Sequence, residues 1–504
     1  MNMLLDRSTM SFCRIASAGL IIVFSGCAVG PDFERPQPPP VKGYTSDAPV
    51  SVLAAGPGEP VQKISFGQNL PEQWWELFHS QRLNQVIREA LAGSPTLASA
   101  QATLAQAQQA VIVARGGYYP QLDAVASAQR LHNSTVGVSG VTSNLYSVGA
   151  TASFAPDVFG GTRRHVEQQE ALAENQQQQL AAAYLALTGN AATQAITIAA
   201  VRLQIGAVEE ILTNDQQNLQ LVQLKFQAGK ASHLDELTAE SQLASDQALL
   251  YPLEQQLSVA QHALAVLAGH FPGEWASPDF DLTEFTLPGE LPLSIPSELV
   301  HRRPDILAAE AQLHASSAAI GVATAQLYPS LSISGTLGFR SFSSATLFQG
   351  TNPYSSVIAN LTQPIFHGGA LRAQKQAAVD AFQASFATYR QTVLSAFGQV
   401  ADVLQALEHD AQLVAAQKDA LDISTNSLTL QRESYTAGKS DLLQLITAER
   451  AYQEARVGYA RAQAQRYQDT TQLFVAMGGG WCDCKTDVSD KAQVAGDAKA
   501  KKSP

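Results

Sequence analysis

Two stretches of the sequence, FQAGKASHLDELTAES at Phe226–Ser241 and YTAGKSDLLQLITAER at Tyr435–Arg450, share one pattern and lie 209 positions apart. In each, the lysine of Ala-Gly-Lys is followed two positions later by Ser or Asp, and a helical run comes next. Gly-Lys is also the end of a phosphate-binding loop, but that loop needs a glycine five positions before its second glycine. Leu224 and Glu433 hold those positions, so neither copy is a nucleotide site.

The same spacing recurs elsewhere, which indicates that the chain is duplicated. A register that holds over about 140 residues is typical of an internal repeat with one order of elements in each half. The matches are Pro95 with Pro304 and Tyr119-Pro120 with Tyr328-Pro329 at 209 positions, and Gly160-Gly161 with Gly368-Gly369 at 208.

Each half is expected to contain one very long helix that reverses at Ala-Gly-Lys. No proline interrupts 161–229 or 369–438, and at 1.5 Å per residue ~67 helical residues reach ~100 Å. Glycine supplies the left-handed conformation that ends a helix, and Ser or Asp caps the start of the next. Gly229 and Gly438 are the expected C′ caps, Ser232 and Asp441 the expected N-caps, and the predicted helices are 161–228, 232–268, 369–437 and 441–476.

Between Tyr-Pro and the long helix, apolar and polar residues alternate with period two in each half of the chain. LYSVGATASF (145–154) places Tyr146 and Phe154 on one face, opposite Ser147 and Thr151, and SLSISGTLGF (330–339) repeats this design. QLDAVASAQ (121–129) and SVIANLTQ (356–363) complete strand hairpins at about 119–156 and 328–366, with polar loops expected at 130–144 and 340–355.

Strands of about ten residues with one apolar face and one face of Ser, Thr and Gly are typical of a transmembrane β-barrel. The alternative is a small antiparallel sheet packed on helices, which leaves the polar face with nothing to pack. Four strands cannot close a barrel, and unpaired edges do not persist in lipid. Several chains must therefore share the barrel: two give eight strands and a filled interior, and three give twelve and a wet lumen.

The N-terminus predicts a secreted lipoprotein. Arg7 and Arg14 precede ASAGLIIVFSGC (16–27), a run too short to span a membrane as a mature helix. Its end, Phe24-Ser25-Gly26-Cys27, resembles a bacterial lipobox, so 1–26 is the expected signal peptide and Cys27 the lipidated residue. The alternative is an ordinary signal peptide with a chance cysteine. Ala28, where Asp would favour inner-membrane retention, points to the outer membrane.

Composition excludes several other functions. A net charge of −12 argues against a nucleic-acid partner, which requires a basic face. The ten histidines form no metal-ligand spacing, and no nucleophile elbow is present, so no motif supports an enzyme. Cys482 and Cys484 lie in a polar tail (481–504). A metal site or a strained disulfide is possible for such a pair, but a tail without a functional role is the favoured interpretation.

Five motifs together resemble a known family. They are FSGCAVGPDFERP (24–36), QWWELF (73–78), RRPDILAAEAQL (302–313), LYPSLSISG (327–335) and MGGGW (477–481). In this order they are similar to the outer-membrane factors of bacterial tripartite efflux systems, the TolC and OprM-like family, and most of all to its NodT-type lipoproteins. The resemblance covers nearly everything from Cys27 to Trp481.

The resemblance implies a mainly α fold with a membrane β-barrel. It implies a homotrimer with four strands per chain in a shared twelve-stranded barrel, a long periplasmic α-helical barrel and an equatorial belt. The chain then divides into a lipid-anchored N-terminal and equatorial segment (27–79), a first structural repeat (80–287), a second structural repeat (288–480) and a flexible tail (481–504).

The function that the resemblance implies is a passive exit duct in the bacterial outer membrane. Such a duct carries drugs or other small solutes and works with a periplasmic adaptor and an inner-membrane pump, usually of the resistance-nodulation-division class. It needs no cofactor beyond the lipid on Cys27. The alternatives are the same duct serving metal-cation efflux or type I protein secretion, and, more remotely, a structural surface lipoprotein.

The resemblance also assigns roles to the two turns. Gly229, Lys230, Gly438 and Lys439 are the expected adaptor-contacting tips. In the family, acidic side chains just past the second tip narrow the resting entrance, but Gln444 and Thr447 hold the matching positions here. A modified ring of Asp441 or Asp235 with Tyr435 is the resulting hypothesis for the gate.

Overall fold

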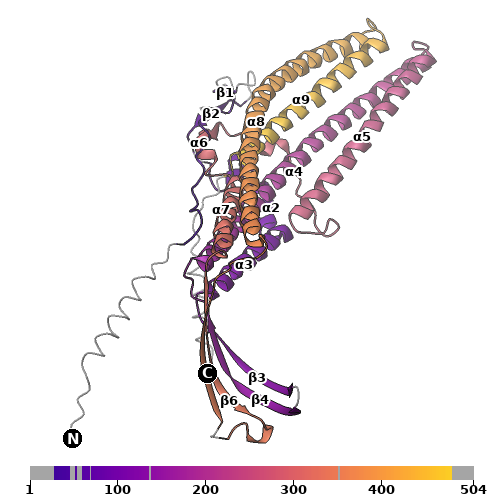
Figure 1. The fold of residues 1–504 in the computed structure, drawn as a ribbon. Coiled ribbons are helices and arrows are strands. Elements are labelled where there is room, and N and C mark those ends of the chain that lie inside the picture. The colour runs from indigo at the N-terminus through magenta and orange to yellow at the C-terminus, as the bar shows by residue number, and fades with distance from the viewer. Residues whose placement is uncertain are drawn as a thin grey trace, which may run out of the picture. The chain divides into compact units, whose positions relative to one another are not determined.

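The computed structural model describes residues 28–41, 43–45, 51–53, 60–68, 70–135, 138–349 and 352–479. The segment expected to be a signal peptide (1–26), the expected lipidation residue Cys27 and the tail with Cys482 and Cys484 lie outside the described residues. Figure 1 shows the course of the chain.

The chain forms two compact units that do not follow the sequence repeat. The first, here called the sheet unit, comprises Met1–Gln37, Ala100–Gln179 and Leu307–Thr392. The second, the helical unit, comprises Pro38–Ser99, Leu180–Ile306 and Val393–Pro504. Each unit therefore takes corresponding pieces from both halves of the duplicated sequence.

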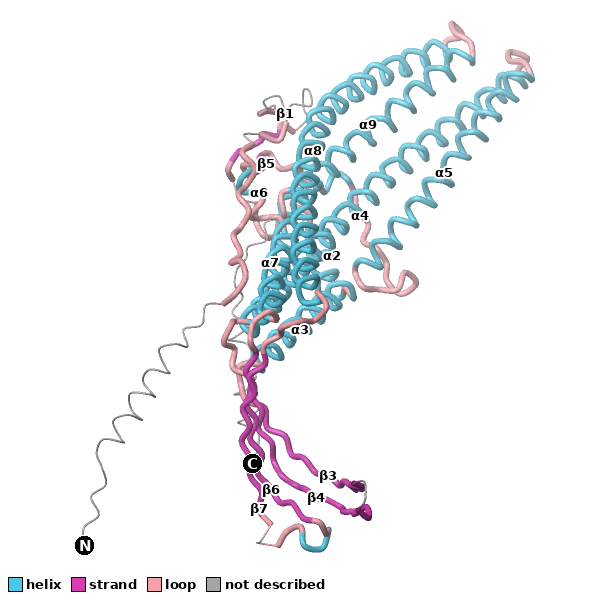
Figure 2. The backbone as a smooth tube through the Cα atoms, viewed as in Figure 1, coloured by secondary structure: helices cyan, strands magenta, loops and turns pink. Residues whose placement is uncertain are grey.

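The sheet unit contains a four-stranded antiparallel sheet. Its strands are β3 (Gln121–Thr135), β4 (Val138–Phe154), β6 (Ser330–Ser341) and β7 (Pro353–Thr362), in the order β3-β4-β6-β7 (Figure 2). The β4–β6 pairing joins the hairpin of the first half to that of the second. Strands β3 and β7 are the two edges of this sheet.

The register gives the sheet one apolar and one polar face. Residues directly opposite one another share a face, so Ala150 lies beside Ala124 and Leu337, whereas Thr151 lies beside Asp123 and Thr336. On the polar face, the hydroxyls of Ser127 and Ser147 are 2.7 Å apart, and those of Thr151 and Thr336 are 3.3 Å apart. On the apolar face, Leu337 and Val357 are 68% and 81% exposed in the single chain.

One expectation for the sheet is wrong. The segment 130–144 was expected to be a loop, but β3 continues to Thr135 and β4 begins at Val138. Backbone pairing persists along this stretch, with a register shift between Asn133 and Thr135, and His132 Nδ1 lies 2.8 Å from the hydroxyl of Thr142. Paired β-branched residues outweigh the local turn signals of Gly, Ser and Asn. The second connection is a loop that contains the short helix η3 (Ser344–Thr346).

Four helices carry the long elements that were expected from the sequence. They are α4 (Gly161–Gln227), α5 (His233–Leu267), α8 (Ala370–Thr436) and α9 (Leu442–Ala476), of 67, 35, 67 and 35 residues. In the helical unit α9 lies against α4, because Gln468 donates to Thr197 and Arg461 donates to Gln204. In the described part of the chain, no helix combines the length and apolarity that a membrane crossing needs.

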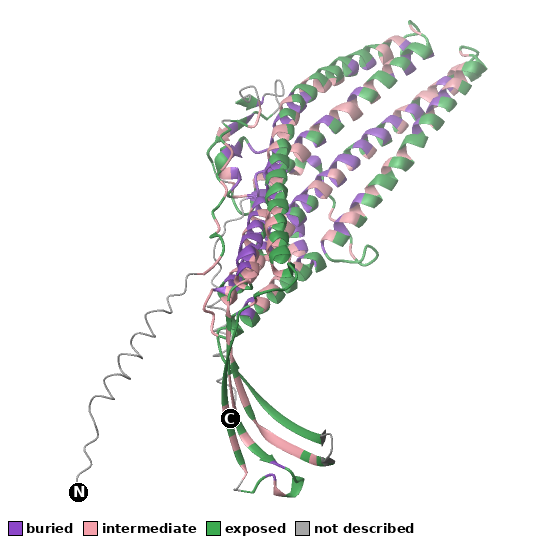
Figure 3. Ribbon diagram, viewed as in Figure 1, coloured by how far each residue is buried: buried purple, intermediate pink, exposed green. Residues whose placement is uncertain are grey.

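A second, mixed region of the helical unit holds a small sheet and most of the buried aromatic side chains of the described residues. Figure 3 shows buried residues along the long helices. Trp74, Phe78 and Phe474 pack together, with ring centroids 5.6 to 6.5 Å apart. The buried Arg466 of α9 donates to the side chain of Gln62 and to the carbonyl oxygen of Pro60, both at 2.9 Å, and so holds the small sheet against α9.

The remaining elements have the following bounds. The small sheet contains β1 (Val52–Leu53), β2 (Gln62–Phe66) and β5 (Glu290–Leu293) in the order β1-β2-β5. The helices are η1 (Trp74–Phe78), α2 (Gln81–Gly93), α3 (Pro95–Gly116), η2 (Leu282–Glu284), α6 (Pro296–Leu299) and α7 (Pro304–Ala325).

Candidate functional site

The first tip of the helical unit is the reversal between α4 and α5. Gly229 has φ +69°, and the N–H of Lys230 donates to the carbonyl oxygen of Lys225 at 2.7 Å, so the left-handed glycine ends the helix. Helix α5 then begins with a capping box, in which Ser232 accepts from the N–H of Asp235 and Asp235 accepts from the N–H of Ser232.

The second tip, between α8 and α9, uses the same turn with a different cap. Gly438 has φ +70°, and the N–H of Lys439 donates to the carbonyl oxygen of Ser434 at 2.8 Å. Asp441 caps α9 by accepting from the N–H of Gln444 at 2.8 Å. Lys230 and Lys439 are both exposed at the tips.

The two tips are held together by an apolar cluster that contains Tyr435. The Tyr435 side chain is only 6% exposed, and the Lys225 ammonium lies 3.6 Å from the centre of its ring. Lys225 also donates to the carbonyl oxygen of Tyr435 at 3.2 Å. The buried residues packed around Tyr435 are Val222, Ala239, Leu428, Leu442, Leu445 and Ile446.

The pKa values of Tyr435 and Lys225 are both shifted in this cluster, and Asp235 contributes to the shift of Tyr435. Burial, and then the negative charge of Asp235, raise the pKa of the Tyr435 phenol. Burial lowers the pKa of Lys225. The charge of Asp235 therefore acts on the Tyr435 phenol, whereas Asp441 is exposed and caps α9.

Two of the gate candidates, Gln444 and Thr447, are exposed and already hydrogen-bonded. The side chain of Gln431 on α8 donates to the side-chain oxygen of Gln444 at 3.3 Å. The Thr447 hydroxyl donates to the carbonyl oxygen of Leu443 at 2.7 Å. The Gln431–Gln444 bond links α8 to α9, whereas the Thr447 bond lies within α9.

Lys225 is the tip residue that the sequence reasoning missed. It lies four positions before Gly229, where a basic residue near a helix C-terminus is explained by the helix dipole alone. Its contact with Tyr435 joins residues 210 positions apart, and no local pattern reports such a pairing.

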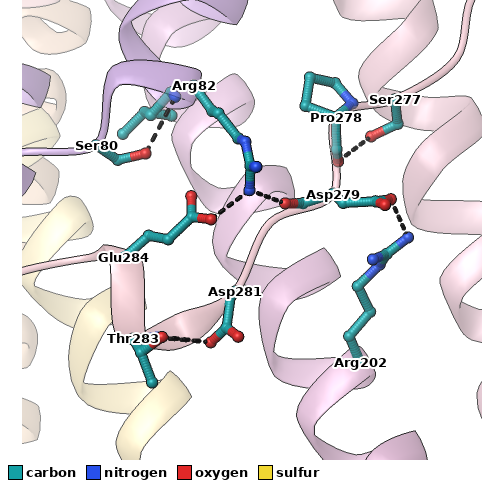
Figure 4. A network of polar contacts seen from close by, with 10 residues as sticks. Ser80, Arg82, Arg202, Ser277, Pro278, Asp279, Asp281, Thr283 and Glu284 are labelled. Carbon is teal, nitrogen blue, oxygen red and sulfur yellow. Dashed lines mark hydrogen bonds and ion pairs between the residues drawn. The ribbon is translucent and has the colours of Figure 1, made fainter.

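Figure 4 shows a second polar cluster, at a surface pocket of the helical unit. Arg82 forms an ion pair with Glu284 and donates to the carbonyl oxygen of Asp279, whose carboxylate pairs with Arg202. Asp281 caps η2 by accepting from the N–H of Thr283 at 2.9 Å, and this bond lowers the pKa of its carboxyl group. Acids and bases here neutralise one another and tie α2 and α4 to the connection before η2.

In the sheet unit, the chain just after Cys27 is strapped to the beginning of α4. The Arg164 side chain, 5% exposed, donates to Asp32 at 2.6 Å and to the carbonyl oxygen of Val29 at 3.2 Å. A side chain at Gly160 would meet Ala28, at 2.6 Å from its Cα atom. Further along, the ring of Phe33 stacks on that of His314, and Arg35 pairs with Glu310. We call Ala28–Arg35 the N-terminal strap.

Comparison with known proteins agrees with this geometry. The family model described as outer membrane efflux protein matches residues 86–270 and again 295–479, more than half of the chain. The two matches begin 209 positions apart, which is the spacing of the sequence repeat. One model therefore describes each half separately.

Individual proteins are similar over most of the length. The pyoverdine export outer membrane protein OpmQ of Pseudomonas putida is 31% identical over 446 residues, covering 87% of this chain and 94% of that protein. Nodulation protein T of Rhizobium leguminosarum bv. viciae is 28% identical over 492 residues, covering 97% and 98%. The structure of the outer-membrane channel OprN has a TM-score of 0.81 at 28% identity, covering 90% of this chain and 100% of that one.

Duplicated long hairpins, an amphipathic sheet and these similarities define the class of outer-membrane channels that serve efflux. The chain belongs to the outer membrane efflux protein family. It is an exit duct of a tripartite efflux pump in the bacterial outer membrane, and its partners are an adaptor and an inner-membrane pump. This family consists of channels rather than enzymes.

Proposed function

We propose that three copies of the chain share one twelve-stranded barrel in the outer membrane and so form the duct. The observation that carries this proposal is the sheet β3-β4-β6-β7, which has two open edges, an exposed apolar face and a face of Ser and Thr. Open edges are not stable in lipid, whereas three such sheets joined edge to edge have none. The apolar face then meets lipid and the polar face lines the lumen.

The helices extend the same arrangement into the periplasm. Each chain contributes the hairpins α4–α5 and α8–α9, so three chains supply six hairpins around a tube. The two hairpins are similar in length and in turn chemistry, which supports a pseudo-sixfold wall. Within one chain, side-chain hydrogen bonds between α4 and α9 hold the two hairpins together.

The N-terminal strap supports a lipid anchor on Cys27. Ala28 packs at Gly160, and Arg164 holds Val29 and Asp32, so the chain is fixed one residue after the expected acylated cysteine. Acyl chains on Cys27 would then enter the outer membrane close to the point where β4 leads into α4. Two or three acyl chains are enough for stable anchoring.

The tips are the surface that we assign to the adaptor. Gly229, Lys230, Gly438 and Lys439 are exposed at the two turns, and six such turns would ring the mouth of the tube. A ring of short, similar turns suits a partner that presents helical hairpins of its own. An inner-membrane pump of the resistance-nodulation-division class completes the pathway for drugs or other small solutes.

The gate of the duct is expected to carry its acidic residues at other positions than the family does. Because Gln444 and Thr447 replace acids, we assign the charge at the entrance to Asp441 and Asp235, with Tyr435 as the packed residue behind them. Cation selectivity measured for single channels in planar bilayers tests this assignment. We expect Asp441→Ala or Asp235→Ala to lower the preference for K⁺ over Cl⁻, and unchanged selectivity in both variants would contradict the assignment.

The cargo is tested by deleting the gene and growing the cells against antibiotics, organic solvents and metal ions. Sensitivity to antibiotics or solvents that a plasmid copy reverses is the expected result. Sensitivity to metal ions alone would assign the duct to cation efflux, and loss of a secreted protein would assign it to type I secretion.

A further inference from the structure

Three carboxyl side chains are buried together between the two helical hairpins of the helical unit. Asp215 of α4, Asp246 of α5 and Glu449 of α9 are 3%, 4% and 4% exposed. Asp215 lies 14 residues before Gly229, which is ~21 Å along the helix from the tip. The cluster is therefore separate from Asp235 and Asp441 at the turns.

The cluster contains far more acid than base. Asp246 Oδ2 accepts from Gln242 at 2.8 Å and from Gln453 at 3.0 Å, and both donors are neutral amides. Glu449 Oε1 accepts from Asn218 at 2.5 Å and lies 3.5 Å from the guanidinium of Arg432. Arg432 of α8 is the one cation that faces the three acids within the described residues.

Asp215 is the least satisfied member. Its Oδ2 is buried and accepts no hydrogen bond from the described residues, and its nearest titratable neighbours are Asp246, Glu449 and Arg432. A buried carboxylate without a donor is costly, whereas a protonated carboxyl can itself donate to a neighbouring carboxylate. Across the described residues, no group of His, Cys, Asp and Glu is arranged to hold a metal ion, so a proton is the ligand that suits this geometry.

Electrostatic interactions also favour a bound proton at Asp215. Burial first, and then the hydrogen bond to Asp246 and the charges of Asp246 and Glu449, raise the pKa of Asp215 to about 8. Burial also raises the pKa of Glu449, although Asn218 and Arg432 oppose the change. Near neutral pH, Asp215 is therefore protonated, and its carboxyl group can donate a hydrogen bond to Asp246.

We propose that Asp215, Asp246 and Glu449 form a proton-binding site that fastens the α4–α5 hairpin to the α8–α9 hairpin. With the proton bound, the acids of α4 and α5 pack against Glu449, Gln453 and Arg432 of the other hairpin. Without the proton, the negative charge of Asp215 faces two further acids across the contact, and among the described residues only Arg432 offsets it. Loss of the proton therefore loosens the hairpins just behind the tips.

The direction in which stability changes with pH follows from the pKa values of Asp215 in the folded and the unfolded chain. The folded value, about 8, lies above the reference value of 3.8 for an unfolded chain. The stabilisation from the proton is therefore complete below pH ~4, and it is lost as pH rises through the folded pKa. Between pH 6 and 8 the protein should lose stability, and above that range the loss should level off.

The chain offers an internal comparison, a buried acid with a half-buried acidic neighbour, and this pair does not bridge the hairpins. Asp410 of α8 and Asp469 of α9 belong to one hairpin, and burial together with Asp469 raises the pKa of Asp410 to about 8. Arg466 partly offsets this pair. Both pairs contribute to pH-dependent stability, but only the Asp215 cluster connects the two hairpins.

The first test is thermal unfolding of the purified full-length protein in detergent between pH 6 and 9.5. We expect the wild-type midpoint to fall by a few degrees between pH 6 and 8. Asp215→Asn should remove about half of this fall, Asp410→Asn the other half, and Glu240→Gln, an exposed acid on α5, none. Asp246→Asn serves as a second variant of the site. A fall of unchanged size in both Asp215→Asn and Asp246→Asn would overturn the proposal.

The second test is single-channel conductance against pH, and it rests on the proposed channel. Wild type and Asp410→Asn should conduct more as pH rises through about 8, whereas Asp215→Asn should stay in the low-conductance state. Conductance that rises equally in Asp215→Asn would overturn the proton site and leave the duct intact. Absence of conductance at every pH would contradict the duct, while the unfolding test would still judge the proton site.

Discussion

At the scale of single residues, two glycines set the ends of the longest helices. Gly229 and Gly438 have φ values of +69° and +70°, and a Cβ atom at either position would meet nothing within 4 Å. The reason for glycine is thus backbone conformation alone, since a side chain in the left-handed region costs about 1–2 kcal/mol.

Because only Gly438 needs the left-handed conformation, Ala should have opposite effects on stability at Gly438 and at Gly206. Gly438→Ala should destabilise by about 1–2 kcal/mol, whereas Gly206→Ala, inside α4 and also free of clashes, should stabilise by about 0.5–1 kcal/mol. Shifts of the thermal midpoint at fixed pH, down for the first and up for the second, provide the measurement. A midpoint that rises in both variants would show that the tip does not need the left-handed glycine.

Residue-level prediction from the sequence succeeds where the cause is local. The glycines at the turns and the caps Ser232 and Asp441 are visible because each acts within four residues of itself. Burial of Tyr435 against Lys225 and the gathering of Asp215 with Glu449 depend on pairings more than 200 residues long. No local pattern contains that information, so these features came only from the structure.

At the scale of elements, the four strands of the large sheet share one apolar and one polar face. The alternation in 145–154 and 330–339 predicts the faces correctly, because period two is a property of any strand. Strand ends are less predictable: the polar segment 130–144 looks like a loop, yet pairing between β3 and β4 carries most of it into the sheet. Long-range backbone pairing decides this point.

The neighbours Ser356 and Val357 on β7 test the two faces. Val357→Arg puts a charge on the apolar face and should cost about 2–4 kcal/mol near the middle of the membrane. Ser356→Arg puts the same side chain on the polar face and should be tolerated. The amount of folded protein in isolated outer membranes is the measurement, and equal loss in both variants would contradict the assignment of the faces.

At the scale of the whole molecule, duplication explains most of the architecture. Each half supplies one strand hairpin and one helical hairpin, and the two compact units collect like parts from both halves. The sequence repeat, the two matches of the family model and the β4–β6 pairing all describe this one arrangement. Order along the chain was therefore readable from spacing alone, whereas the grouping into units needed three-dimensional contacts.

We have proposed that the sheet of one chain, with its two open edges, is one third of a barrel. The most direct test is the native mass of the purified full-length protein in lipid nanodiscs, which counts the chains in each channel. We expect a mass of three mature chains, each carrying lipid on Cys27, with no stable smaller species. A particle of one, two or four chains that remains folded in lipid would contradict it.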